Sequence, residues 1–455
     1  MPSDGKPTRI PIIAVILAFG AAIIGFIAWQ LLKPVSDSRV ETLKRRGYPV
    51  TLGELNDWYQ SPPSNENAAF IYTNIFARSA FSNAALDFSM RKWPARGKKF
   101  EPADLDEIKP LLAANEQTFR LFQTAGALPK ARYPIDLRDG SMTMLPHLAQ
   151  VKSGVGFLSG AAVVWAQAGK DEEAVAALIA AGKVADSLQE EPTLISQLVR
   201  YAAWAIVCSR IERVLNLKQL NEEQLARLQQ SLASADNPGC LARGLGGETA
   251  SGHAFFTVLK EQRSLLSGGY LNNAAGTTQS KSADNLKYGL MTGILKVTGI
   301  YAKDRAFYLD SMATNLTIAE QPYPERFKGY QKSAGIVAPG RFMIFSRMLL
   351  PALAKAGLRD ADHTARVRVA QTALAVERFR RANSNSPPAE LNQLTPAFLS
   401  AVPLDPFNGQ PLLFKRAGEG YVVYSVGSDG HDNGGLEQDP NNRNAIHDVT
   451  CVMER

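Results

Sequence analysis

Apolar and polar residues alternate along the middle of this chain with the period of an α-helix. In two successive windows the apolar positions are separated by steps of 4, 3, 4 and 3 residues, first at Ala174, Leu178, Ala181, Ala185 and Leu188 and then at Leu194, Leu198, Tyr201, Ala205 and Cys208. Residues spaced in this way share one face of a helix, so each window predicts a helix with a buried apolar stripe. Cys208 lies on the second stripe and is expected to be a core residue rather than a reactive thiol.

The first window also belongs to a predicted helical hairpin. Gly169-Lys170-Asp171 separates it from an earlier apolar stripe within residues 158–168. The pair resembles one tetratricopeptide unit, but no second unit follows in register, so we expect a helix pair rather than a repeat array. Further helices are predicted over 221–235, 304–319 and 342–358, and a loop over 264–282, which is rich in Gly, Ser, Asn and Thr. Residues 34–360 are thus expected to form a helical body of packed hairpins.

The pattern changes near residue 361. A helix with apolar positions at Val369, Ala373, Val376 and Phe379 must end before Pro387-Pro388, because proline lacks the backbone N–H that a helix needs. Two candidate strands follow at 411–415 and 421–426, joined as a hairpin. Residues 361–455 are therefore predicted to be a small α+β module with a short antiparallel sheet, so that the fold class as a whole is mainly α.

The strongest apolar signal lies near the N-terminus. The run Ile10–Leu32 spans 23 residues without a charged side chain, which is enough for a helix to cross about 30 Å of hydrocarbon. Residues 1–33 are therefore predicted to be an N-terminal tail and a transmembrane helix that attaches the protein to a membrane. A cleaved signal peptide is the alternative, but its apolar region is typically only about 7 to 15 residues long.

Composition narrows the function classes. The 455 residues are 45% hydrophobic and 20% charged, which excludes a disordered chain and a many-span membrane protein. The net charge of +7 is spread along the sequence rather than gathered in one tract, so we expect no nucleic-acid partner. Three cysteines without CxxC spacing are too few for a disulfide framework.

Common catalytic motifs are missing from the sequence. HExxH, GxSxG, a Walker A loop and GxGxxG do not occur, and the five histidines form no HxH or HxxxH pair. We therefore expect a protein that is not an enzyme. Two alternatives stay open: the run "YPIDLRDG" is either a turn before a helix or a polar site, and a hydrolase site could assemble from Asp136, His147 and His253.

The C-terminal module resembles a known family. It contains, in order, "ALAVERFRRAN", "SPPAELNQL", "VPLDPFNGQPLLF" and "GYVVYSVGSDGHDNGG". In this order of parts residues 362–448 resemble the soluble domain of the major pseudopilin of type II secretion systems, and the whole chain resembles uncharacterised bacterial membrane-anchored proteins with such a tail. The chain departs from pseudopilins in two ways: the glycine, aromatic residue and glutamate that follow their leader do not stand around Arg9 to Ile13, and more than 300 residues lie between its apolar run and the module.

The resemblance implies a calcium site in the acidic loop near the C-terminus, with Asp429 at the position of a family ligand. Independently, oxygen-bearing side chains beside several glycines suit a hard cation such as Ca²⁺. The loop is not an EF-hand, because His431 and Pro440 would occupy ligand positions 3 and 12. A solvated loop that binds nothing is the alternative. The predicted structural Ca²⁺ ligands are Asp429, Asp432, Asn433, Glu437, Asp439 and Asp448.

The orientation of the chain depends on this loop. The positive-inside rule, applied to Lys33, Arg39 and the basic run Lys44 to Arg46, would keep the body in the cytoplasm, but long domains cross membranes largely regardless of charge. A weak calcium site works where calcium is millimolar, which favours the outside. We therefore expect a single-pass protein of the bacterial inner membrane with a periplasmic body and a binding or scaffolding role. Its partners would be pseudopilin-like or other envelope proteins, and the first alternative is an accessory component of a type II secretion or pilus-like system.

Overall fold

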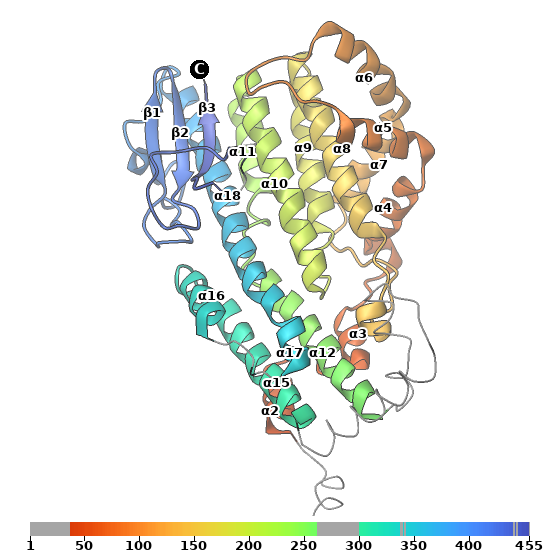
Figure 1. Cartoon of the computed structure of the whole chain (residues 1–455). Coiled ribbons are helices and arrows are strands. Elements are labelled where there is room, and N and C mark those ends of the chain that lie inside the picture. Colours follow the sequence, from red (N-terminus) through yellow and green to blue (C-terminus); the bar gives the residue numbers. More distant parts are fainter. Residues whose placement is uncertain are drawn as a thin grey trace, which may run out of the picture.

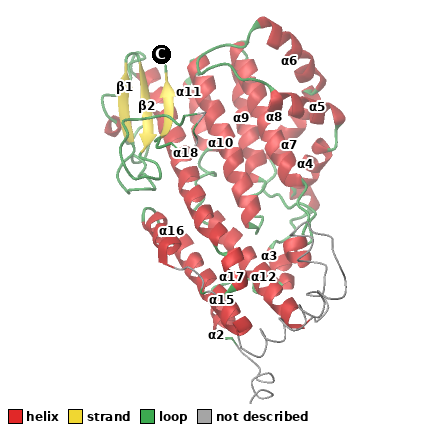
Figure 2. Cartoon of the chain, in the orientation of Figure 1, coloured by secondary structure: helices red, strands yellow, loops and turns green. Residues whose placement is uncertain are grey.

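The computed structural model of the chain describes residues 37–261, 300–336, 340, 343–439, 442 and 445–454. This part is mainly helical, as the sequence predicts, and its one sheet lies at the C-terminal end (Figure 1, Figure 2). The predicted membrane anchor Ile10–Leu32 and the loop 264–282 fall outside the described residues. Within the described part, every helix is too short or too polar to span a bilayer.

In the described part of the chain, six α-helices and two short 3-10 helices precede the central bundle. Their ends follow local signals: Thr51 and Glu54 form a reciprocal capping box, and Asn67 caps the next α-helix by accepting a hydrogen bond from the backbone of Ala69. The elements are α2 (Ser38–Arg45), α3 (Leu52–Trp58), η1 (Ser64–Glu66), α4 (Ala68–Phe76), α5 (Ser79–Met90), α6 (Pro102–Ala114), α7 (Glu116–Gly126) and η2 (Leu137–Met142).

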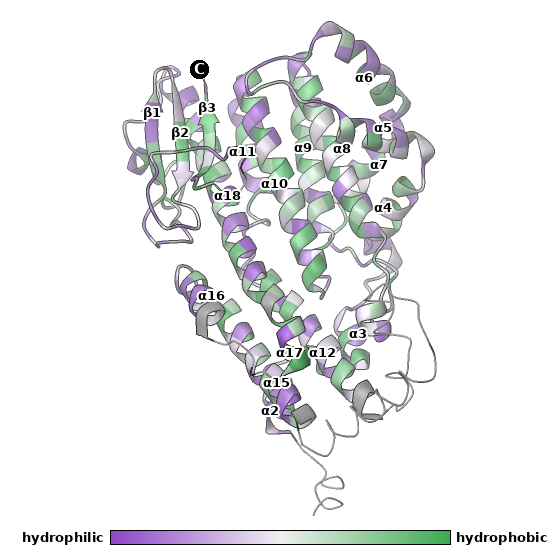
Figure 3. Ribbon diagram, in the orientation of Figure 1, coloured by the Kyte–Doolittle hydropathy of each residue, from purple (hydrophilic) through white to green (hydrophobic). Residues whose placement is uncertain are grey.

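The central bundle confirms the helices that periodicity predicted. It comprises α8 (His147–Gln167), α9 (Asp171–Asp186), α10 (Leu194–Leu217), α11 (Glu222–Ser231) and α12 (Cys240–Glu261). The predicted hairpin is α8 and α9, which pair through the turn at Gly169, where the positive φ of 79° suits glycine. Figure 3 shows apolar residues concentrated over α8, α9 and α10, and Cys208 is buried as expected.

A second helical group leads to the C-terminal sheet. Its members are α15 (Ile300–Ala319), α16 (Glu325–Ile336), α17 (Ile344–Leu349) and α18 (Pro351–Ala382). The predicted helix over 342–358 is therefore divided between α17 and the start of α18. The helix α18 also runs without a break through residues 360 and 361, where the sequence pattern placed a domain boundary.

The sheet has the order β1-β2-β3, with both neighbouring pairs antiparallel. Its strands are β1 (Leu413–Ala417), β2 (Gly420–Ser425) and β3 (Val449–Met453), of which only the first two were predicted. The sheet packs on α18, where the Tyr421 hydroxyl donates a hydrogen bond to the Ala373 carbonyl. It also packs on α10, where Asn216 Nδ2 donates a hydrogen bond to the Val452 carbonyl. One hydrophobic cluster therefore continues from the helical body into the module.

Candidate functional site

The acidic loop predicted to bind calcium connects β2 to β3. Asp448 immediately precedes β3 and is buried, with 2% of its surface exposed. Its Oδ2 accepts hydrogen bonds from the backbone N–H groups of Gly435, at 2.7 Å, and Leu436, at 3.0 Å. These two hydrogen bonds connect the middle of the loop to its C-terminal end and fix the position of the Asp448 carboxylate.

Three oxygen atoms of this loop converge on the side-chain amide of Asn433. Its Nδ2 lies 3.0 Å from Asp429 Oδ2, 3.1 Å from the His431 carbonyl oxygen and 3.5 Å from Asp448 Oδ1. An amide N–H₂ group and a hard cation both attract oxygen lone pairs, so this convergence suits a cation ligand set. Half of the six predicted ligands, Asp429, Asn433 and Asp448, thus come together.

The other three predicted ligands have separate surroundings. Asp432 is exposed and accepts a hydrogen bond from the backbone N–H of Gly434 at 2.8 Å. Glu437 pairs with Arg96 of the body, and Asp439 is exposed. In the portion of the chain that the structure describes, no three His, Cys, Asp or Glu side chains gather closely enough to hold a metal ion. A cation at Asn433 would therefore depend on two carboxylates, one carbonyl and the Asn433 amide.

Arg96 attaches the acidic loop to the helical body. Its Nη1 lies 3.1 Å from Glu437 Oε1 and 3.4 Å from Glu454 Oε1, and its Nε lies 3.0 Å from Glu212 Oε1 on α10. Burial alone would lower the pKa of this guanidinium, but the three carboxylates raise it above its ordinary value. Local sequence patterns could not predict this cluster, because its members come from four separate segments of the chain.

The three residues of the alternative hydrolase site have separate partners. His147 Nε2 lies 2.9 Å from Glu191 Oε2, whereas His253 Nδ1 lies 2.7 Å from the Val50 carbonyl oxygen. Asp136 accepts a hydrogen bond from the Arg138 backbone at 2.9 Å and caps η2, so the run "YPIDLRDG" leads into a short helix. Each group is thus used in a local structural contact of its own.

Glu191 is the centre of a buried polar network that sequence reasoning missed. Its side chain is fully buried and accepts hydrogen bonds from Ser196 Oγ, at 2.5 Å, and from the Tyr59 hydroxyl, at 3.3 Å. With His147 it forms a buried pair. Buried polar groups require hydrogen-bond partners, so this network stabilises the contact between the N-terminal helices and α10.

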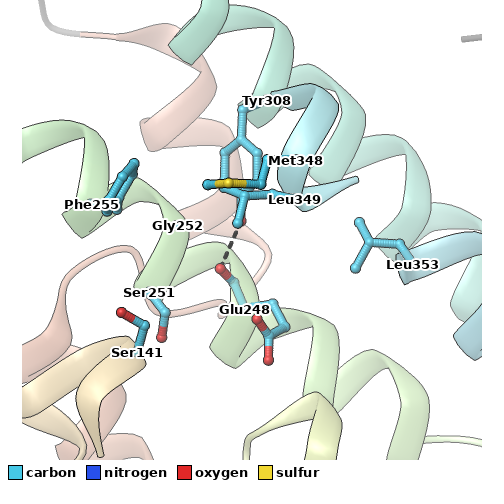
Figure 4. A pocket seen from close by; sticks show the side chains of 9 residues that line it. All are labelled: Ser141, Glu248, Ser251, Gly252, Phe255, Tyr308, Met348, Leu349 and Leu353. Carbon is cyan, nitrogen blue, oxygen red and sulfur yellow. Dashed lines mark hydrogen bonds between the residues drawn. The ribbon is translucent and has the colours of Figure 1, made fainter. Parts of the chain in front are cut away.

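A pocket of about 250 Å³ lies between η2, α12, α15, α17 and α18 (Figure 4). Its polar wall contains Glu248, whose Oε1 accepts a hydrogen bond from the Leu194 backbone at 3.2 Å. Burial raises the pKa of this carboxyl above its ordinary value. The lining residues are Ser141, Glu248, Ser251, Gly252, Phe255, Tyr308, Met348, Leu349 and Leu353.

Two contacts of Tyr308 shape this pocket. Its hydroxyl donates a hydrogen bond to the Glu248 backbone carbonyl at 2.7 Å. A Cβ atom at Gly252 would lie only 2.1 Å from the same hydroxyl oxygen, so the absence of a side chain there lets α15 approach α12. The sequence did not reveal the pocket, because its walls come from four separate parts of the chain.

Comparison with known proteins adds no relative: no family model matches the chain, and neither a curated protein nor a solved structure is significantly similar to it.

Proposed function

We propose that this chain is a membrane-anchored, non-enzymatic binding or scaffolding protein of the bacterial envelope, whose pseudopilin-like C-terminal module is stabilised by Ca²⁺. The observation that carries the calcium part is the convergence of Asp429, His431 and Asp448 oxygens on the Asn433 amide. Rotation of that amide would replace its N–H₂ group by a fourth oxygen. The residues that would hold the ion are Asp429, Asn433 and Asp448, together with the His431 carbonyl.

A structural role for the ion follows from the position of the loop. The loop connects strands β2 and β3, and Arg96 of the helical body forms an ion pair with Glu437 of the loop. An ion that binds only the folded loop stabilises the protein by about 1.4 kcal/mol at ten times its Kd. Calcium would therefore hold the sheet and its contact with the body in place rather than take part in a reaction.

The scaffolding part of the proposal is supported by the use of the polar groups inside the body. Glu191 is bound to His147, Tyr59 and Ser196, and Asp360 pairs with Arg326. Groups that are committed to fixed hydrogen bonds stabilise an architecture and are poorly placed to transfer protons to a substrate.

The calcium proposal is tested by thermal unfolding of the full-length protein in detergent, with calcium or with a chelator. Calcium should raise the melting temperature of the wild type and of Asp432→Ala, because Asp432 lies outside the convergent set. Asp429→Ala should lose this rise. If the wild type shows no rise, or if Asp429→Ala keeps it, the calcium site is wrong.

A further inference from the structure

The pocket between α12 and α15 has a polar wall and an apolar wall. Figure 4 shows the hydroxyl groups of Ser141 and Ser251 on the same side as Glu248. Phe255, Met348, Leu349 and Leu353 supply the apolar side chains of the lining, and Gly252 and Tyr308 complete it. Small-molecule sites commonly combine an apolar lining with a few polar groups that orient the ligand, and this volume suits a ligand smaller than a typical drug.

The carboxyl group of Glu248 has no cationic partner among the residues that the structure describes. Its one protein hydrogen bond comes from the Leu194 backbone, and no nearby positive charge lowers its pKa. Arg243, five residues earlier on α12, is bound instead to the Glu190 carbonyl and lies over the Trp58 ring. A carboxyl without a basic side-chain partner can accept a hydrogen bond from the ammonium group of a ligand, whose positive charge would favour the ionised carboxylate.

One oxygen of Glu248 is used at the N-terminus of α10. Leu194 is the first residue of α10, and its backbone N–H donates a hydrogen bond to Glu248 Oε1. Thr193 caps the same helix separately, because its hydroxyl oxygen accepts a hydrogen bond from the Ser196 backbone N–H. A neutral amide could accept the same hydrogen bond as the carboxyl group. The second carboxyl oxygen of Glu248 thus has no hydrogen-bond partner among the described residues and is available to a ligand.

An exposed apolar side chain lies at the pocket. Met348 lines the pocket with 61% of its surface exposed, and Met142, which follows the lining residue Ser141, is 58% exposed. Methionine side chains adapt to ligands of different shape because they are unbranched and flexible. An apolar group can therefore enter beside Met348 while a charged group reaches the polar wall.

We propose that this pocket binds a small amphipathic amine, with the ammonium group on Glu248 and the Ser141 and Ser251 hydroxyls and the hydrocarbon part against Phe255 and Met348. The site is separate from the acidic loop and does not depend on calcium. Its ligand class is set by one carboxyl without a basic side-chain partner beside an apolar wall, which favours a single positive charge on a short aliphatic or aromatic skeleton.

Phenethylamine and 2-phenylethanol test this proposal, because they share one skeleton and differ in charge. Calorimetry on the full-length protein in detergent should show that the amine binds at least about tenfold more tightly than the alcohol, as expected for a charge-assisted hydrogen bond. Glu248→Gln keeps an acceptor for Leu194 and should remove this preference. Glu190→Gln, on the partly exposed pair with Arg243, is the matched control and should retain it.

A second pair of variants tests the place of binding. Ser251→Phe should fill the pocket and abolish binding of both compounds, and Ser141→Phe does the same from η2 if the first variant does not fold. Thermal unfolding establishes that each variant is folded. No detectable binding of the amine to the wild type, unchanged preference in Glu248→Gln, or unchanged binding in a folded plugged variant would each overturn the proposal.

Discussion

Gly182 and Trp204 pack so closely that a Cβ atom on Gly182 would lie 2.6 Å from Trp204 Cη2. The indole cannot easily move away, because it is buried and its Nε1 donates a hydrogen bond to Asp186 at 2.9 Å. Gly182→Ala should therefore overpack the contact between α9 and α10 and lower the free energy of unfolding by about 1 to 3 kcal/mol. Urea unfolding of the full-length protein measures this change.

Gly156 provides the matched control for this substitution. It lies inside α8, and a Cβ atom there would meet no atom within 4 Å. Because alanine is a better helix former than glycine, Gly156→Ala should stabilise the protein by up to about 1 kcal/mol. Effects of the same sign in the two variants would contradict the packing argument.

His363 should make the stability depend on pH. Burial, assisted by Arg200, lowers the pKa of this imidazole from its ordinary value of 6.5 to about 4. The unfolded chain therefore takes up the proton first, so stability is complete above pH 6.5 and is lost as the pH falls towards 4. The full loss amounts to about 3 kcal/mol.

Replacement of this histidine isolates its share of the pH dependence. His363→Gln can still donate to the Ala235 carbonyl, which His363 Nε2 approaches at 3.0 Å, but it cannot titrate. Urea unfolding between pH 7 and pH 4 should show a shallower loss of stability for this variant. Some slope should remain, because burial also lowers the pKa of His253. An identical slope in wild type and variant would be the contrary result.

Asp360 and Asp362 lie two residues apart on α18 but should respond differently to substitution. Asp360 is buried and accepts hydrogen bonds from the Tyr201 hydroxyl, at 2.8 Å, and from Arg326 Nη1, at 3.0 Å. Asp360→Ala should lower the free energy of unfolding by about 3 to 5 kcal/mol, because it leaves a buried guanidinium unpaired. Thermal or urea unfolding measures the loss.

Asp362 serves as the control on the same helix. It is partly exposed and forms an (i, i+4) pair with Arg366. Surface pairs of this kind contribute little, so Asp362→Ala should lower the free energy of unfolding by less than about 1 kcal/mol. Comparable losses for the two variants would show that burial of the Asp360 pair is unimportant.

The three cysteines should be unreactive in the folded protein. All are free and buried, and burial raises the pKa of the thiols to about 12 for Cys208 and about 11 for Cys240, and well above its ordinary value for Cys451. Since the thiolate is the reactive form, iodoacetamide at pH 8 should modify none of them until urea unfolds the chain. Mass spectrometry counts the modified thiols, and rapid labelling under native conditions would contradict the prediction.

Local sequence patterns predicted the helices, because helix formation depends on residues that are close in the sequence. The stripes of α9 and α10 were visible because a helix buries every third or fourth residue. The strand β3 (Val449–Met453) was missed, since it pairs with β2 across a long intervening loop, whereas a short hairpin turn joins β1 to β2. The position of Glu437 was equally out of reach, because its partner Arg96 lies 341 residues away.

The same distinction applies to the two candidate sites. Asp429, Asn433 and Asp448 were predicted together because one acidic loop contains them. The pocket at Glu248 requires the packing of α12 against α15 and α17, which no single segment encodes. The acidic loop could therefore be predicted from the sequence, whereas the pocket could not.

The continuity of α18 has a mechanical consequence. Its 32 residues form a rod about 48 Å long, which begins beside α17 and ends against the sheet. A hinge requires an interruption at which dihedral angles can change, and this rod has none near residue 360. The unbroken helix therefore connects the sheet rigidly to the helices that surround the pocket at Glu248.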